Sequence, residues 1–279
     1  MSSLLNYHRL VPSSDLQKVI KDTNQTVHIL ASGSSITQVN MIKICQQPSI
    51  FVNGSIQLFA DYQFNQPVAY VISDHRFIEH NVSLMMQYYN GQCPLFITQS
   101  VLENLQKFAS DYLTAISDNI HLIHNFQKPI NRNKTNFFEK IRKKLSHPNV
   151  NNQFIKLKQP NSSKKLIGVS TDIRHGFVEA GTVVFVATQL AYTMGFKSIY
   201  IHGMDLLNTH QPRFYENQKE QAPCKLDKAV TNRIVPSFDF LAEVYQQQDV
   251  KVYNGSPISK GIFDNLVFSD IFLIDKDIV

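Results

Sequence analysis

Short apolar runs alternate with longer amphipathic stretches along most of the chain. Apolar runs of this length suit buried strands, and the stretches between them are long enough for helices. The expected strands cover residues 27–31, 49–52, 68–72, 94–97, 120–123, 198–201 and 250–253, and the clearest helices cover 77–89, 182–193 and 228–247. This alternation predicts an α/β fold, with a Rossmann-like, mostly parallel sheet and helices on both of its faces.

A small or polar cluster follows most of the expected strands. The clusters are residues 32–35 after the first strand, 53–55 after the second, 73–76 after the third and 203–205 after the sixth. The carboxyl ends of parallel strands meet at one edge of a sheet, and in open α/β sheets the ligand binds beyond that edge. We therefore expect the functional residues at this edge.

The first cluster suits a phosphate group. Gly33 allows the backbone to approach a ligand closely, and Ser34 and Ser35 add hydroxyl donors where a helix begins. The pattern matches neither the GxGxxG motif nor a P-loop, so a serine-rich helix cap is the alternative. A similar cluster follows the second strand, as Asn53, Gly54 and Ser55. The recurrence favours a binding site, because both clusters face the same crevice.

Acidic residues stand at two other strand ends. Asp205, after Gly203, is placed to accept a hydrogen bond from a ribose hydroxyl or a base amino group. The alternative for Asp205 is an N-cap on the segment that follows. Asp74 and Arg76 lie at the end of the third strand, where a surface ion pair is the alternative to a functional role.

A long stretch rich in Pro and Gln, within residues 206–227, has too little periodicity for a helix. Long loops over a strand-end crevice are often lids. Within this lid, Arg213 could grip a carboxylate or phosphate through two hydrogen bonds, and Tyr215 could donate its hydroxyl to a departing phosphate. The alternative is that both residues only anchor the loop.

The charge is uneven. The net charge is +5, yet residues 128–165 hold eleven basic residues and only one acidic residue, Glu139. Within this basic insertion, residues 136–145 form a short amphipathic pattern, which suits either an anionic membrane surface or a solvated surface helix. We expect no nucleic-acid partner, because the segment carries no recognisable motif of that kind. The candidate membrane or acceptor contacts are Lys140, Arg142, Lys143 and Lys144.

Several features argue for one soluble, cytoplasmic domain over residues 1–279. The start of the chain lacks the continuous apolar stretch of a signal peptide, and no apolar run reaches the roughly 18 to 20 residues that span a bilayer. The cysteines, Cys45, Cys93 and Cys224, form no CxxC pair, which fits free thiols in a reducing compartment. The only DxD pattern lies at 275–277, away from any expected strand end, so we expect no metal and no cofactor.

Taken together, the motifs resemble the WaaZ/RfaZ-type lipopolysaccharide core proteins, which are associated with adding an extra 3-deoxy-D-manno-octulosonic acid (Kdo) to the inner core. The resemblance covers most of the chain, and the order and spacing of the motifs carry it. These motifs are residues 52–55, 73–77, 172–176, 185–192, 203–205, 213–215 and 253–257.

More distantly, the layout resembles the bacterial sialyltransferases that use a CMP-activated sugar, a GT-A-like variant of the nucleotide-binding fold. That resemblance implies cytidine contacts from residues 32–35, from Asn53, and from Gly203 with Asp205. It also implies that Tyr215 binds the departing phosphate. The catalytic His of that family, which lies beyond the lid, has no counterpart in this sequence.

The resemblance implies transfer of Kdo from CMP-Kdo, a substrate rather than a cofactor, to a lipid A–core acceptor at the inner face of the cytoplasmic membrane. Arg76, Arg174 or Arg213 would bind the sugar carboxylate. An inverting transfer needs a general base, for which we favour Asp74 over Asp205 and Glu216. The alternatives are transfer of another CMP-activated keto sugar acid, similar to sialic acid, and a non-catalytic protein that binds a nucleotide sugar or glycolipid.

Overall fold

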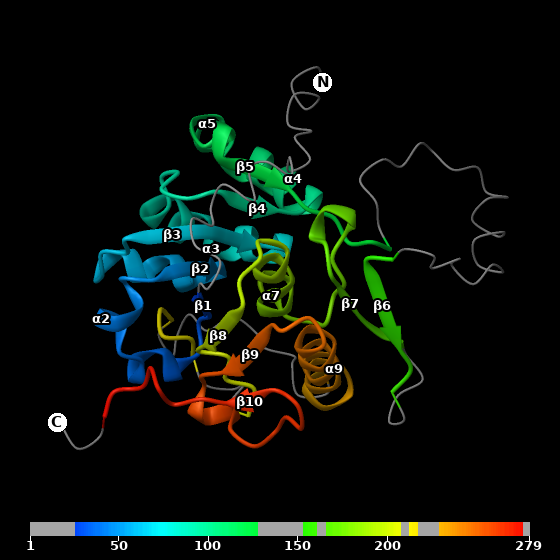
Figure 1. Cartoon of the computed structure of the whole chain (residues 1–279). Helices are drawn as coiled ribbons and strands as arrows, with labels where there is room; N and C mark the ends of the chain where they lie inside the picture. Colours follow the sequence, from blue (N-terminus) through cyan, green and yellow to red (C-terminus); the bar gives the residue numbers. More distant parts are fainter. Residues whose placement is uncertain (1–25, 128–152, 161–165, 208–211, 217–228, 276–279) are drawn as a thin grey trace, which may run out of the picture.

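A computed structural model of the chain describes residues 26–127, 153–160, 166–207, 212–216 and 229–275. Its centre is an eight-stranded sheet in the order β10-β9-β8-β1-β2-β3-β4-β5, in which every pairing is parallel (Figure 1). The strands are β1 (Thr26–Leu30), β2 (Pro48–Val52), β3 (Gln66–Ile72), β4 (Leu95–Ile97), β5 (Ile120–Leu122), β8 (Ser198–His202), β9 (Lys251–Asn254) and β10 (Val267–Phe268).

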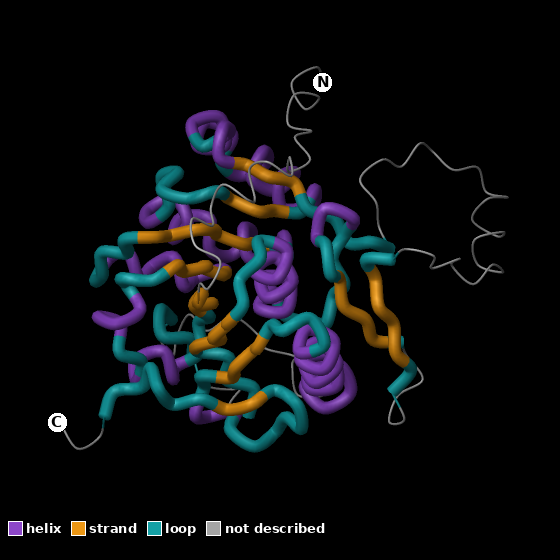
Figure 2. The backbone as a smooth tube through the Cα atoms, viewed as in Figure 1, coloured by secondary structure: helices purple, strands orange, loops and turns teal. Residues whose placement is uncertain are grey.

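Helices cover both faces of the sheet, and each face has its own hydrophobic core (Figure 2). On one face α7 (Val183–Thr193) and α9 (Val235–Gln246) pack over the strands. The other face is covered by α2 (Met41–Ile44), α3 (His75–Tyr88), α4 (Gln99–Phe108) and α5 (Ser110–Ala115). The predicted α/β fold, with a mostly parallel sheet between two helical layers, is confirmed.

Helix α7 shows how the sequence specifies this packing. Eight consecutive residues, 184–191, are buried, as expected for a helix over the middle of a parallel sheet. Thr182 caps the helix by accepting a hydrogen bond from the Val184 amide. Gly195, just past the end, has a φ of 94°, the left-handed conformation that glycine favours after a helix.

A two-stranded antiparallel hairpin, β6 (Ile155–Lys158) and β7 (Ile167–Ser170), flanks α9 and was not predicted (Figure 1). The buried Gln189 of α7 holds it, because its Oε1 accepts a hydrogen bond of 2.9 Å from the Ser170 amide. The Tyr245 hydroxyl of α9 donates to the Ser170 carbonyl at 2.7 Å. Strand β6 falls within the basic insertion, so that part of the insertion is docked onto the domain.

Strand β1 is the topological switch point of the sheet. The chain proceeds from β1 through β2, β3, β4 and β5 toward one side, and later returns to place β8 on the other side of β1. Crevices for ligands in open α/β sheets form at such points, outside the carboxyl ends of the strands. The clusters at 32–35 and 203–205 flank this position.

Some predictions lie outside the described residues. Of the lid at 206–227, the described part is 206–207 and 212–216, and of the basic insertion it is 153–160. The four candidate membrane contacts, Lys140, Arg142, Lys143 and Lys144, fall in the part that is not described. Among the described residues, no helix combines the length and the apolar character needed to cross a membrane.

Candidate functional site

The carboxyl edge of the sheet brings the predicted clusters side by side. The turn after β1 is hydrogen-bonded directly to the turn after β8, because the Gly33 amide donates to the Gly203 carbonyl at 2.9 Å. A Cβ on Gly33 would lie 2.5 Å from Cγ of Asp205, so no larger residue fits between the two turns. Gly203 itself has a φ of 69°, which favours glycine.

Asp205 is the centre of a dense hydrogen-bond network at this point. Its Oδ2 accepts from the Ser35 amide at 2.8 Å and from the Ser34 hydroxyl at 3.3 Å. Its Oδ1 accepts from the Ser256 hydroxyl at 2.6 Å and also from the Ser35 hydroxyl. Gly33 occupies the N-cap position of the 3-10 helix η2 (Ser34–Gln38), so no side chain caps that helix. The hydroxyls of Ser34 and Ser35 instead donate to Asp205, which does not support the alternative of a serine helix cap.

Ser256 is a member of this network that the sequence interpretation did not include among the site residues. It follows β9 and is completely buried. The signal was its place in the Asn-Gly-Ser cluster at 254–256, which ends a strand as the cluster at 53–55 does.

A pair of buried histidines lies in the strands next to the Asp205 network. His28 Nδ1 is 3.0 Å from His202 Nε2, and His28 Nε2 is 3.1 Å from Oε1 of Gln47. Phe272 from the C-terminal segment packs edge-on against both imidazole rings. Burial, only partly opposed by the hydrogen bond to Gln47, lowers the pKa of His28 to about 4. Burial and the neighbouring His28 hold the pKa of His202 well below its ordinary value. Both rings are therefore neutral at neutral pH.

The turn after β2 differs from the turn at Asp205. Asn53 adopts a left-handed conformation with a φ of 48°, which is uncommon for a residue other than glycine. Its side-chain Oδ1 is buried and has no hydrogen-bond partner among the described residues. The Tyr70 hydroxyl fixes the backbone by donating to the Asn53 carbonyl at 2.8 Å. Ser55 is fully buried and its hydroxyl donates to the Val52 carbonyl, so Ser55 stabilises the turn.

The described part of the lid lies directly on this turn. The ring of Tyr215 occupies the space that a Cβ on Gly54 would need, which explains why a glycine stands there. The Phe214 amide donates to the Ser32 carbonyl at 3.2 Å, so the lid is also tied to the turn after β1. The structure thus brings the two predicted regions, the lid and the strand-end clusters, into contact.

Within the lid, Arg213 and Glu216 form an ion pair. Arg213 Nη1 is 2.6 Å from Oε1 of Glu216, and the Arg213 amide donates to Oε2 at 3.0 Å. Side-chain hydrogen bonds also link Tyr215 to Arg213 and Ser32. Burial raises the pKa of Tyr215 to about 12, although the charge of Arg213 acts to lower it. At neutral pH, Tyr215 therefore keeps its proton and can act as a hydrogen-bond donor.

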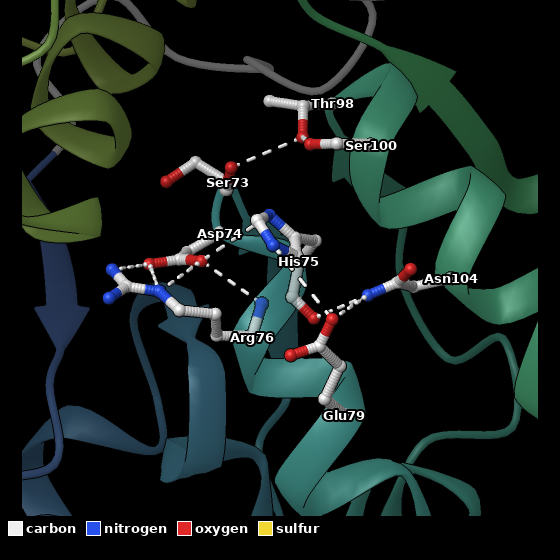
Figure 3. A network of polar contacts seen from close by, with 8 residues as sticks. All are labelled: Ser73, Asp74, His75, Arg76, Glu79, Thr98, Ser100 and Asn104. Atoms are coloured by element: carbon white, nitrogen blue, oxygen red, sulfur yellow. Dashed lines mark hydrogen bonds and ion pairs between the residues drawn. The ribbon is translucent and has the colours of Figure 1, made fainter. Parts of the chain in front are cut away.

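The end of β3 carries the predicted pair of Asp74 and Arg76 (Figure 3). Asp74 caps α3 by accepting from the Arg76 amide at 3.0 Å, and Arg76 Nε lies 3.0 and 2.9 Å from the two carboxylate oxygens. Burial acts to raise the pKa of Asp74, but the hydrogen bonds and charge of Arg76 outweigh it and lower that pKa. In this arrangement Asp74 is a weak base and the pair resembles the ion pair given as the alternative.

Figure 3 also shows how the neighbouring elements fix the position of this pair. The Thr98 hydroxyl, at the end of β4, donates to the Ser73 carbonyl at 3.1 Å. The Asn104 side chain of α4 donates to the His75 carbonyl at 3.1 Å and to Oε1 of Glu79 at 3.0 Å. The start of α3 is therefore fixed by its neighbours, whereas the Arg76 side chain is 69% exposed and its contacts shown here are with Asp74.

Arg174, a sequence candidate for binding a carboxylate, lies elsewhere. Its guanidinium is paired with the buried Asp172, with Nε 2.7 Å from Oδ1. Both residues line a cavity of about 300 Å³ together with Lys197, which directly precedes β8. This cavity is at the amino edge of β8 and β9, opposite the clusters described above. The expectation that Arg174 could join the strand-end site is therefore wrong.

Comparison with known proteins identifies the family to which the chain belongs. A family model described as 3-deoxy-D-manno-octulosonic acid transferase WaaZ matches residues 10–266. A protein of Escherichia coli (strain K12), named a probable 3-deoxy-manno-octulosonic acid transferase, is 25% identical over 93% of this chain and 88% of its own length. A Salmonella typhimurium (strain LT2) protein of the same name is 26% identical over 86% of this chain and 84% of its own length.

Among solved structures, the sialyltransferase CstII from Campylobacter jejuni, in complex with cytidine-5'-monophosphate, is similar over 91% of this chain and 88% of its own length. The sequence identity is 15% and the TM-score is 0.44. A likeness at this level assigns no residue and no activity to the chain.

Proposed function

The chain belongs to the 3-deoxy-D-manno-octulosonic acid transferase WaaZ family, and we propose that it is a glycosyltransferase that moves Kdo from CMP-Kdo onto the Kdo/inner-core region of lipopolysaccharide. The donor would bind at the carboxyl edge of the sheet, beneath the lid. Residues 33–35, 53–55 and 203–205 would form the floor of its nucleotide site.

The observation that carries the proposal is the buried Oδ1 of Asn53, which has no hydrogen-bond partner among the described residues and belongs to the residue before Gly54, on which the Tyr215 ring lies. Buried acceptors without partners are rare in folded proteins, and each one calls for an explanation. Donor hydroxyl or amino groups of the cytidine would satisfy Asn53. The neighbouring phenol, which keeps its proton at neutral pH, would donate to the phosphate.

Charge on the reacting groups explains the basic residues of the site. Kdo carries a carboxylate, which Arg213 or Arg76 would bind through two hydrogen bonds. As the glycosidic bond breaks, CMP leaves as a phosphate monoester and its negative charge grows. A hydrogen bond donated by the Tyr215 hydroxyl would stabilise that charge selectively in the transition state. In this proposal the transfer uses no metal ion or further cofactor.

Donor binding would also activate Asp74. In the free protein Arg76 holds the pKa of Asp74 down, and its own side chain is largely exposed. A donor carboxylate that draws the Arg76 side chain away would remove the charge and the side-chain hydrogen bonds that weaken this base. Asp74 would then accept the proton of the attacking acceptor hydroxyl.

The acceptor would be a lipid A–core glycolipid at the inner face of the cytoplasmic membrane. We propose that the basic insertion, through Lys140, Arg142, Lys143 and Lys144, attracts this anionic surface. Neutralising these residues should weaken binding to anionic vesicles and leave the affinity for CMP unchanged.

The test is turnover with freshly generated CMP-Kdo and a Kdo-containing lipid A acceptor, read by mass spectrometry. We expect the acceptor to gain the mass of one Kdo. Loss of a general base lowers a rate by roughly 100-fold or more, which is the effect expected for Asp74→Asn. Tyr215→Phe, which keeps the ring on Gly54 and removes only the hydroxyl, should lower the rate without displacing the lid.

Other outcomes would redirect the proposal. Product with a sialic-acid-like CMP donor, and none with CMP-Kdo, would favour transfer of a different keto sugar acid. Tight CMP-Kdo binding without turnover of any donor would support the non-catalytic alternative. Wild-type rates in Asp74→Asn would exclude Asp74 as the base.

A further inference from the structure

We propose that Asp205 is a positioning residue and not a contact to the nucleotide, and that the buried Ser256 is a second positioning residue of the same site. This inference rests on the proposed function, because it concerns how the nucleotide crevice is built. It departs from the sequence interpretation, in which Asp205 contacts a ribose hydroxyl or a base amino group.

The Asp205 carboxylate is already saturated with hydrogen bonds from the chain. An ionised carboxylate offers about four lone-pair directions for hydrogen bonds. Four donors of the chain already occupy Asp205: the Ser34 hydroxyl, the Ser35 amide, the Ser35 hydroxyl and the Ser256 hydroxyl. A ligand hydroxyl would have to displace one of them. Displacing a donor from this partly buried network costs about as much as the new hydrogen bond contributes.

Ser256 is buried and cannot reach a ligand. Ser256 is 0% exposed, and its amide donates a hydrogen bond to Oδ1 of Asn254 at 3.0 Å. A second tether runs parallel to it, because the Ser259 hydroxyl donates to the Met204 carbonyl at 2.6 Å and accepts from the Leu206 amide at 2.8 Å. The segment after β9 therefore fixes the Gly203–Asp205 turn from the protein side.

The Asp205 network reaches the turn after β1, at the edge of the proposed crevice. Asp205, which follows β8, accepts hydrogen bonds from the amide and the hydroxyl of Ser35 and from the hydroxyl of Ser34. Both serines follow β1. Ser256 orients Asp205, and its Oγ lies 3.2 Å from Oγ of Ser35, whose single hydroxyl proton is donated to Asp205. Three strand ends are thus locked together. The network sets the conformation of the turn at 33–35 before any ligand arrives, which is how a site gains pre-organisation.

The first experiment needs no nucleotide. We would measure amide hydrogen exchange of Ser34 and Ser35 in the wild-type protein, in Ser256→Ala and in Asp205→Asn. Ser256→Ala should accelerate exchange of the Ser35 amide about tenfold, the equivalent of roughly one hydrogen bond, and Asp205→Asn should do so more strongly. Ser237→Ala, which removes another buried hydroxyl in α9, is the matched control and should change nothing there. Unchanged exchange in Ser256→Ala would overturn the positioning role.

The second experiment separates positioning from contact. Affinities for CMP, 2'-deoxy-CMP, 3'-deoxy-CMP and UMP would be measured for the same proteins as a double-mutant cycle. A positioning role predicts that Ser256→Ala and Asp205→Asn weaken all four ligands by the same factor, with ratios between ligands kept within about twofold. If the preference for CMP over one analogue disappears only in Asp205→Asn, Asp205 contacts that group directly and the inference is wrong.

The two experiments also separate this inference from the proposed function. A wild-type protein that binds none of the nucleotides would contradict the proposed function. The exchange measurement would still decide whether Asp205 and Ser256 order the turn.

Discussion

The two halves of the carboxyl edge differ in whether their polar groups are paired with one another. At the ends of β8, β1 and β9, Asp205 and the serines around it pair with one another. At the end of β2, Asn53 has a left-handed backbone and a buried oxygen that finds no partner in the part of the chain that the structure describes. Both halves consist of small polar residues that follow apolar strands, so composition alone does not distinguish them.

The difference indicates separate roles for the two halves. A polar network whose members satisfy one another rigidifies the structure around it. A buried acceptor that is left unpaired calls for an explanation, and a ligand that completes it is one. We infer that the Asp205 half builds the crevice, whereas the Asn53 half, with the lid above it, binds what enters.

The largest expected effect concerns the buried histidines next to the Asp205 half of the edge. The folded-state pKa of His28 is about 4, below the ordinary value of 6.5, so the unfolded chain binds more protons between these pH values. Stability is therefore fully present above pH 6.5 and is lost as the pH falls toward 4, by about 3 kcal/mol for His28. Urea denaturation at several pH values measures this loss. His28→Gln should flatten it, and an unchanged slope in that variant would rule out His28 as its source.

The next largest effect concerns the Asn53 half of the edge, where the lid contacts the turn after β2. In Gly54→Ala the new methyl group would overlap the Tyr215 ring, so the lid must move. Displacement of a positioned group by about 1 Å can cost roughly 100-fold in rate, and we expect a loss of that order in Kdo transfer. Gly261→Ala is the control, because it adds a methyl group at a positive φ with no atom within 4 Å. Equal losses in both variants would point to general destabilisation.

The smallest effect sharpens the comparison at Asn53 itself. Asn53→Gly keeps the left-handed conformation accessible and removes the unpaired oxygen. We expect CMP affinity to fall about tenfold while the free energy of unfolding rises by up to about 1 kcal/mol. Calorimetric titration and denaturation of the same variant measure both quantities. A loss of stability together with unchanged affinity would assign Asn53 a purely structural role.

The sequence was sufficient for seven of the eight strands of the sheet and for the polar clusters at their carboxyl ends, whereas the two-residue strand β10 was not predicted. Strands β1, β2 and β8 are apolar runs that end in small polar clusters, a pattern that local sequence carries. The hairpin β6–β7 was missed because β6 reads Ile-Lys-Leu-Lys inside a basic segment, and its partner only becomes visible through contacts with α7 and α9.

Partner choice within the site could not be predicted. The hydrogen bond between Asp205 and Ser256 joins residues 51 positions apart, and nothing local distinguishes it from an open acidic residue. For Asp74 the ion pair with Arg76, two residues along, was foreseeable as an alternative, whereas its lowered pKa depends on the folded geometry. Sequence patterns thus located the edge, and packing decided which of its polar groups are already satisfied.

The most direct test of where the nucleotide binds is a titration of the isotope-labelled protein with CMP, followed by amide chemical shifts. The account predicts saturable shifts at residues 33–35, 53–55 and 203–205, together with the lid around Tyr215. Shifts confined to the cavity at Asp172, Arg174 and Lys197, at the opposite edge of the sheet, or the absence of any saturable shift, would contradict it.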